Sequence, residues 1–208
     1  NCWSCKRLKY YKALLFGSIG SIVETSEIQR KSFNKAFKQY GLDWYWTKRE
    51  YLSLLSKSGG KDRISRYAKK KKIEINSVYL RNLKTKIFNN YLKKHQLKLR
   101  PGVKYLISLC KKENIKIAFV SSTSKNNINA ILYCLRNSIN KRDFNFIGNA
   151  KLVKKYKPNP DIYLLALKKL KLKANDCVAI EDSQESLNSA RRAKIKCIIF
   201  PGKFHSSK

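Results

Sequence analysis

The first clear pattern in the chain is a short apolar run that ends in a glycine-containing turn. After Lys12, residues 13–16 are all apolar, as expected for a strand that is buried on both faces. Residues 17–20 then include the glycines Gly17 and Gly20, which favour a tight change of direction. The pattern predicts a strand over residues 12–16 that enters a tight loop.

From residue 25 onward the apolar positions follow a helical period. We expect a helix that begins with a capping box of Ser26 and Gln29 and ends at Gly41. Three or four further helical segments follow, at about residues 48–55, 61–70 and 76–94. No strand pattern interrupts this region, so residues 25–98 are predicted to form a helical insertion.

After Arg100-Pro101-Gly102 the pattern changes to a regular alternation of helices and strands. Helices are predicted over residues 103–113, 125–135, 161–170 and 183–193, and strands over 115–120, 144–148, 177–180 and 195–200. Apolar strands that alternate with helices indicate a parallel sheet covered on both faces. The predicted fold is therefore α/β, a doubly wound parallel sheet with an inserted helical cap. The expected domains are a basic segment (1–11), the α/β core (12–24 and 99–200), the cap (25–98) and a tail (201–208).

Composition adds a strong charge to this picture. The 208 residues include 47 Lys and Arg against 13 Asp and Glu, a formal charge of +34. A hydrophobic fraction of 43% excludes a disordered basic tail, and no apolar run is long enough to span a membrane. Self-repulsion on this scale destabilises a compact state unless polyanions neutralise it. The charge therefore indicates an anionic partner such as RNA.

The six cysteines bear on the redox compartment of the protein, and the absence of methionine bears on how the chain was produced. Cys110, Cys134, Cys177 and Cys197 lie in apolar segments, which favours buried free thiols in a reducing compartment. Cys2 and Cys5 have CxxC spacing without a second pair; they are either unliganded thiols or metal ligands completed by a partner chain. Because the chain has no Met and starts at Asn1, we expect either a trimmed product or a part of a longer chain, with any targeting segment upstream.

Candidate site residues follow the predicted strands, where doubly wound sheets bind their ligands. They are the loop with Gly20, Ser121 and Ser122, the Lys157-Pro158-Asn159-Pro160-Asp161 segment, and Glu181-Asp182-Ser183. In this order they resemble the four motifs of the haloacid-dehalogenase superfamily. Further matches resemble its CbbY-like branch, the sugar-phosphate phosphatases that act on pentulose bisphosphates such as xylulose bisphosphate: Gly41-Leu42-Asp43-Trp44 with Trp46 and Tyr51, and Gly59-Gly60-Lys61 with Arg63.

The resemblance also implies what this chain lacks. Phosphatases of the family attack phosphorus with an aspartate that closes the first strand, and a second aspartate two residues later protonates the leaving oxygen. The corresponding residues here are Gly17 and Ile19, which predicts a pseudo-phosphatase with no catalytic residues. Ser121, Lys157 and Asp182 match the family's phosphate and magnesium positions, and Lys61 and Arg63 are possible anion contacts. No metal or other cofactor is expected, and Mg²⁺ only if the chain is active.

Clusters of basic residues without balancing acids complete the prediction. Lysines suit RNA-backbone contact more than base readout, and the candidates are Lys69, Lys70, Lys71, Lys72, Lys93, Lys94, Lys154, Lys155, Lys168, Lys169, Lys171 and Lys173. The expected function is a catalytically inactive, structural, RNA-contacting subunit of a large organellar ribonucleoprotein, a mitochondrial or plastid ribosome with the mitochondrion favoured. Its expected partners are rRNA and neighbouring proteins, with no membrane insertion. The alternative is an active or ligand-binding sugar-phosphate phosphatase of the CbbY-like type.

Overall fold

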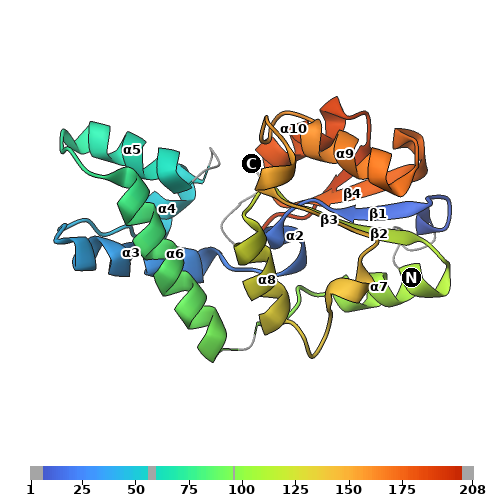
Figure 1. The fold of residues 1–208 in the computed structure, drawn as a ribbon, viewed down its shortest axis with the longest axis horizontal. Helices are drawn as coiled ribbons and strands as arrows, with labels where there is room; N and C mark the ends of the chain where they lie inside the picture. The colour runs from blue at the N-terminus through green and yellow to red at the C-terminus, as the bar shows by residue number, and fades with distance from the viewer. Residues whose placement is uncertain (1–6, 56–59, 96, 203–208) are drawn as a thin grey trace. The chain divides into compact units, whose positions relative to one another are not determined.

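The computed structural model describes residues 7–55, 60–95 and 97–202, with the side chains of residues 60 and 61 excepted. The chain divides into two compact units (Figure 1). One comprises Asn1–Glu24 and Gln96–Lys208 and is called the α/β unit here; the other, Thr25–His95, is called the helical unit. Each unit is described by itself.

The α/β unit is built on a parallel five-stranded sheet. Its strands are β1 (Ala13–Phe16), β2 (Lys116–Val120), β3 (Phe146–Gly148), β4 (Cys177–Glu181) and β5 (Lys196–Ile199), in the spatial order β3-β2-β1-β4-β5. All four strand pairs are parallel. The predicted doubly wound parallel sheet is therefore confirmed, and β1 lies at its centre between β2 and β4.

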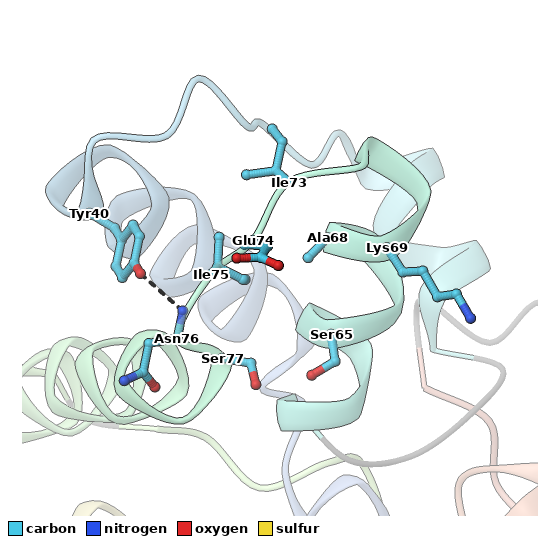
Figure 2. Close-up of a pocket in the computed structure, with 9 residues that line it drawn as sticks. All are labelled: Tyr40, Ser65, Ala68, Lys69, Ile73, Glu74, Ile75, Asn76 and Ser77. Atoms are coloured by element: carbon cyan, nitrogen blue, oxygen red, sulfur yellow. Dashed lines mark hydrogen bonds between the residues drawn. The ribbon is translucent and has the colours of Figure 1, made fainter.

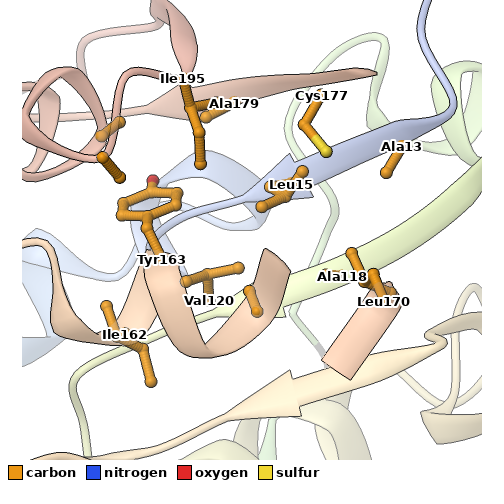
Figure 3. Close-up of a cluster of buried hydrophobic side chains, with 13 residues drawn as sticks. Ala13, Leu15, Ala118, Val120, Ile162, Tyr163, Leu170, Cys177, Ala179 and Ile195 are labelled. Carbon is orange, nitrogen blue, oxygen red and sulfur yellow. The ribbon is translucent and has the colours of Figure 1, made fainter. Parts of the chain in front are cut away.

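Helices cover both faces of this sheet. The structure has α7 (Val103–Lys112) and α8 (Lys125–Cys134) on one face and α9 (Asp161–Leu170) and α10 (Gln184–Arg192) on the other (Figure 1). Short 3₁₀ helices, η1 (Lys141–Asp143), η2 (Ala150–Leu152) and η3 (Ala174–Asp176), lie in the connections. On the side that faces α9, most of the strand residues are small. They pack against larger side chains of α9 (Figure 3); the small residues include Ala13, Ala118, Cys177 and Ala179, and the larger ones include Ile162, Tyr163 and Leu170. Small strand residues let α9 approach the sheet closely.

The loop after β1 is shorter than the sequence predicts, because a four-residue helix, α2 (Ile19–Ile22), begins inside it. Ser18 caps this helix: its Oγ accepts a hydrogen bond from the Ser21 backbone N–H at 3.2 Å. The Ser21 hydroxyl in turn donates to the Ser18 carbonyl. Two serines thus close a turn that we expected the glycines to make.

The helical unit consists of α3 (Ser26–Tyr40), α4 (Lys48–Leu54), α5 (Gly60–Lys71) and α6 (Ser77–Lys94). The predicted capping box of Ser26 and Gln29 is wrong, because the N-cap residue of α3 is Thr25, which makes no side-chain capping bond. The predicted helix end is confirmed: Gly41 has a φ of +86°, a left-handed conformation that costs glycine little. Aromatic rings fill the interior, with Trp46 4.8 Å from Phe33 and 4.7 Å from Phe37 between ring centroids.

The cysteines agree with the prediction in part. Cys110, Cys134 and Cys177 are buried free thiols, whereas Cys197, on the edge strand β5, is free but partly exposed. Burial raises the pKa of Cys110 to about 12 and that of Cys177 to about 11. Cys2 and Cys5 lie outside the described residues. Of the helices in the described ranges, none has the length and apolar character needed to cross a bilayer.

Candidate anion site at the strand ends

The strand order brings the predicted site residues of the α/β unit to one edge of the sheet. Because β1 lies between β2 and β4, the residues that follow them, Gly17, Ser121 and Asp182, come from neighbouring strand ends. Lys157, from the loop before α9, reaches the same place, since its ammonium donates to the Gly17 carbonyl. This edge is where ligands bind in doubly wound sheets.

The centre of the site is a buried ion pair. Lys157 Nζ lies 2.6 Å from Glu181 Oε1, and the side chains of Lys157 and Glu181 are 6% and 0% exposed. The Tyr163 hydroxyl donates to the same carboxylate oxygen. Burial raises the pKa of Glu181, although the Lys157 ammonium acts in the opposite direction. Burial, together with the Glu181 charge, also raises the pKa of Tyr163 well above its ordinary value.

Glu181 and Tyr163 fill the space that a side chain at position 17 would occupy. A Cβ atom built on Gly17 would overlap with Glu181 Oε1 and the Tyr163 hydroxyl oxygen. Similarly, a Cβ atom on Gly20 would overlap with Asp182 Oδ2. Both glycines of the β1 loop therefore face carboxylates delivered by the end of β4. Glycine at position 17 is a requirement of this arrangement.

Arg100 holds the β1 loop in place at this edge. Its Nη1 donates to the carbonyls of Gly20 at 2.7 Å and Phe200 at 2.6 Å, and its Nη2 donates to Pro201 at 2.6 Å. The guanidinium also lies 3.4 Å from the centroid of the Phe200 ring. Burial lowers the pKa of Arg100, whereas the charges of Glu24 and Asp182 oppose that shift. The arginine side chain thus joins α2 to the segment after β5.

The remaining predicted residues differ in their surroundings. Ser121 is buried and accepts a hydrogen bond from the Thr123 N–H at 3.2 Å, which leaves its own proton for an acceptor. Ser183 is the N-cap of α10. Glu181, two residues earlier, ends β4 and pairs with Lys157.

The residues at this edge do not suit a dedicated magnesium site. Mg²⁺ needs near-octahedral oxygen ligation, yet Gly17 and Ile19 have no side-chain oxygen and Glu181 is bound to Lys157 and Tyr163. Within the described residues there is no group of three or more His, Cys, Asp or Glu side chains that could hold a metal ion. Asp182 is the carboxylate that stays available.

The predicted anion contacts of the helical unit can be located only in part. Arg63 is 7% exposed; its Nε donates to the Leu54 carbonyl at 2.9 Å and its guanidinium lies 5.6 Å from the Tyr51 ring centroid. These contacts give Arg63 a structural role inside the unit. The Lys61 side chain lies outside the described residues.

The helical unit also has a groove of its own, of about 780 Å³. It lies between the end of α3, α5 and the segment that leads into α6, with Ile75 and Glu74 at its centre (Figure 2). The Tyr40 hydroxyl accepts a hydrogen bond from the Asn76 N–H across it, at 3.1 Å. Most of the lining side chains are exposed, and none of the phosphate-site residues lines it. The strand-end cluster is thus the better candidate site.

Comparison with known proteins identifies the class. The model of the haloacid dehalogenase-like hydrolase family matches residues 20–200, so the chain belongs to this family. Phosphatases of this family typically use Mg²⁺. The sequence resemblance and the predicted fold are both confirmed.

The similarity extends to a particular branch. Protein CbbY of Cereibacter sphaeroides is 34% identical over 194 residues, which cover 92% of this chain and 84% of that protein. The structure of Rhodobacter sphaeroides CbbY in complex with phosphate has a TM-score of 0.85 at 32% identity and covers 95% of this chain and 89% of that one. A variant of that CbbY, in complex with xylulose-1,5-bisphosphate, has a TM-score of 0.83 at 33% identity and covers 93% and 88%.

These findings overturn the predicted function as an RNA-contacting ribosomal subunit. The relatives reported above are CbbY proteins, solved with phosphate or with xylulose-1,5-bisphosphate, and none of them points to RNA, rRNA, a ribosome or neighbouring proteins of an assembly as partner. The findings also conflict with classifying this chain as a pseudoenzyme. None of them tests whether the replacement of the catalytic aspartates by Gly17 and Ile19 abolishes activity. The organellar localisation stays a prediction. The twelve candidate lysines are all exposed, as lysines on an ordinary solvated surface are: Lys69, Lys70, Lys71, Lys72, Lys93, Lys94, Lys154, Lys155, Lys168, Lys169, Lys171 and Lys173.

Sequence reasoning missed two features of the molecule. Tyr163 was counted only as part of a helix, and its hydroxyl contact with Glu181 has no local signal in the sequence. The position of Lys84, in contrast, could have been predicted from helical spacing. Lys84 lies on the same face of α6 as three buried residues that are four or eight positions away: Leu80, Phe88 and Leu92. A lysine in an apolar stripe indicates a cation whose side chain lies partly inside the unit.

Proposed function

We propose that this protein binds a small sugar phosphate at the carboxyl end of its sheet, as a CbbY-like member of its family. The observation that carries the proposal is the convergence of Ser121, Lys157 and Asp182 on neighbouring strand ends. The similarity to CbbY, which has been crystallised with phosphate and with xylulose-1,5-bisphosphate, supports it. The Ser121 hydroxyl and the Lys157 ammonium are donors suited to a phosphoryl group.

Our proposal for the chemistry is that the bound ligand is not hydrolysed through an aspartyl phosphate. Gly17 has no nucleophile and Ile19 has no proton to give to the leaving oxygen. Proton transfer alone contributes about 10²–10⁴-fold to such reactions. Glu181 does not replace the nucleophile, because it is fully buried and paired with Lys157. Ligand recognition is then the retained part of the family's activity.

Calorimetric titration tests the binding. We expect saturable binding of xylulose-1,5-bisphosphate and of inorganic phosphate, and weaker binding by Ser121→Ala. A hydrogen bond to a charged group contributes about 1.5–3 kcal/mol, so the loss should be about 10- to 100-fold in Kd. Ser138→Ala is the matched control, since this serine is exposed and lies outside the strand ends.

The outcomes separate recognition from turnover. Absence of binding for both ligands would show that the sugar-phosphate proposal is wrong. Binding accompanied by steady release of phosphate in the presence of Mg²⁺ would leave the ligand class intact and contradict the proposed loss of chemistry. An unchanged affinity in Ser121→Ala would remove the strand-end site as the place of binding.

A further inference from the structure

Two carboxylates at the strand-end site have oxygen atoms that no hydrogen-bond donor meets. Glu181 is 0% exposed and its Oε2 has no hydrogen-bond partner, although its Oε1 accepts from Lys157 and Tyr163. The next residue, Asp182, is partly buried, and its carboxylate makes no hydrogen bond or ion pair with any other described residue. Buried acceptors are seldom left without a donor, because their desolvation is costly. The site therefore suits a ligand that supplies a hydrogen-bond donor.

Both carboxylates lie against the loop that follows β1. A Cβ atom on Gly17 would overlap with the Glu181 carboxylate, and a Cβ atom on Gly20 would overlap with Asp182 Oδ2. The Lys157 ammonium reaches the same loop, since it donates to the Gly17 carbonyl. The acceptors without a donor and the lysine thus share one edge of the sheet.

The charges at this edge do not suit a doubly negative phosphate. The Lys157 ammonium lies 2.6 Å from Glu181 Oε1, so these two charges neutralise each other. Asp182 adds a negative charge, and Arg100, the guanidinium nearest in effect, directs its hydrogen bonds to three backbone carbonyls instead. The residues present do not suit the magnesium ion that would otherwise screen a carboxylate from a phosphate dianion. A dianion would therefore be repelled by Asp182.

We propose that the site binds the phosphoryl group of its ligand in singly protonated form and without a metal ion, and that Asp182 accepts the hydrogen bond from the P–O–H group. The inference rests on the proposed function and adds to it the form in which the ligand binds. Ser121 and Lys157 donate to the oxygens that share the negative charge, and Asp182 accepts from the oxygen that carries the proton. Phosphate monoesters lose this proton with a pKa of about 6, so the required form is present at neutral pH.

Asp182 is thus a specificity-determining residue. A carboxylate repels a charged phosphate oxygen, whereas it forms a charge-assisted hydrogen bond with a P–O–H group. A site that offers an acceptor rejects an analogue without the matching proton, because the acceptor is then left unpaired. Sulfate has the shape of phosphate but carries no proton near neutral pH. The protein should therefore discriminate between two anions that differ in their protons.

Calorimetric titration with inorganic phosphate and with sulfate tests the proposal on the full chain. Both titrations are made at about pH 6 with EDTA present, and with about 0.15 M chloride to screen nonspecific binding of anions to the basic surface. We expect phosphate to bind and sulfate to bind at least about 100-fold more weakly, since like-charge contacts are strongly unfavourable.

An isosteric variant then identifies the acceptor. In Asp182→Asn the amide can donate as well as accept, so the two anions should bind with similar affinity. Asp43→Asn is the matched control: it makes the same change in net charge at an exposed position of the helical unit and should keep the discrimination of the wild type.

Three results would overturn this inference and leave the proposed function in place. Equal affinity of the wild type for phosphate and sulfate would show that no acceptor recognises the proton. Phosphate binding that requires added Mg²⁺ would show that a metal ion is needed after all. Unchanged discrimination in Asp182→Asn would place the acceptor elsewhere. The first two results are measured on the wild-type chain, so they do not depend on a variant that folds.

A fourth result would be of a different kind. Absence of binding for phosphate, sulfate and xylulose-1,5-bisphosphate alike would overturn the proposed function, and this inference with it.

Discussion

Each of the two units directs a lysine side chain toward its interior, Lys157 fully buried and Lys84 partly exposed, and the two ammonium groups have different partners. In the α/β unit, Lys157 meets the Glu181 carboxylate at 2.6 Å and also donates to the Gly17 carbonyl. In the helical unit, Lys84 meets two phenylalanine rings and one amide. A buried cation with a carboxylate partner stays charged, whereas one without such a partner tends to give up its proton.

This difference in partners should decide how each lysine affects the stability of the protein. Removal of Lys157 would leave a buried carboxylate uncompensated, while removal of Lys84 would relieve an uncompensated cation. The same substitution, lysine to methionine, should therefore have opposite effects on stability in the two units.

The largest effect is expected for Lys157→Met. Breaking a buried ion pair by removing one partner costs about 3–5 kcal/mol, because the other charge stays in a nonpolar environment. Glu181 is 0% exposed and its Oε2 has no hydrogen-bond partner. Urea denaturation measures the loss, and the exposed Lys155→Met, expected within about 0.5 kcal/mol of wild type, is the control.

The pH dependence of this variant gives a second check. Without Lys157, burial raises the pKa of Glu181 further above its value in the unfolded chain. The folded state then binds more protons than the unfolded one above the unfolded pKa, so stability decreases as pH rises through that range. The destabilisation of Lys157→Met should thus shrink on acidification. A constant difference at all pH values would contradict the ion-pair explanation.

A smaller loss is expected for Gly17→Asp, which restores the family's residue at the nucleophile position. The new side chain would overlap with Glu181 and Tyr163, and insertion into a filled space costs about 1–3 kcal/mol. Part of this cost should be recovered in the Gly17→Asp, Glu181→Ala double variant, because the two side chains compete for one space. A double-mutant cycle measures the coupling, expected at about 0.5–3 kcal/mol; simple additivity would show that the space is not shared.

Much of the α/β fold follows from local sequence patterns. The helix predicted over residues 161–170 is observed as Asp161–Leu170, and the apolar run 13–16 is β1. Hydrophobic periodicity is a local property, so a single pass along the chain detects it. α2 escaped notice because its four residues are too few for a periodic signal, and its Ser18 cap was masked by the nearby glycines.

The sequence predicted which residues make up the candidate site, but not how their side chains contact one another. The order of motifs located Ser121, Lys157 and Asp182, yet the contact of Gly17 with Glu181 joins residues far apart in sequence. Only the three-dimensional structure shows that Glu181 fills the space that a side chain at position 17 would occupy. The net charge of +34 misled the functional prediction, since net charge bears on solubility and nonspecific association rather than on the site.

Lys84→Met should raise the stability of the protein by about 1–2 kcal/mol at pH 7. The pKa of Lys84 is lowered to about 7 in the folded state, below the value of about 10.4 in the unfolded chain. The wild type therefore loses stability as pH falls from about 10 to 7, and the methionine variant lacks that loss. Because the side chain is partly exposed, solvent screening limits the size of the effect. Thermal unfolding from pH 6 to 10 measures it, and a less stable variant at pH 7 would contradict it.

The smallest effect concerns the one polar partner of Lys84. Gln29 accepts a hydrogen bond from the ammonium, and a hydrogen bond to the charged form favours that form. Gln29→Met should therefore lower the pKa of Lys84 further, by about half a unit, which corresponds to about 0.7 kcal/mol and lies within the range of a single hydrogen bond. The shift is read by NMR from the pH dependence of the Lys84 side-chain resonances, whose midpoint should move to lower pH. Lys86→Gln, a change at an exposed position on the same helix, should leave the midpoint in place. A midpoint that moves to higher pH in Gln29→Met would mean that the amide disfavours the charged form, and that the aromatic faces of Phe33 and Phe88 hold the proton on Lys84 more strongly than the contrast with Lys157 implies.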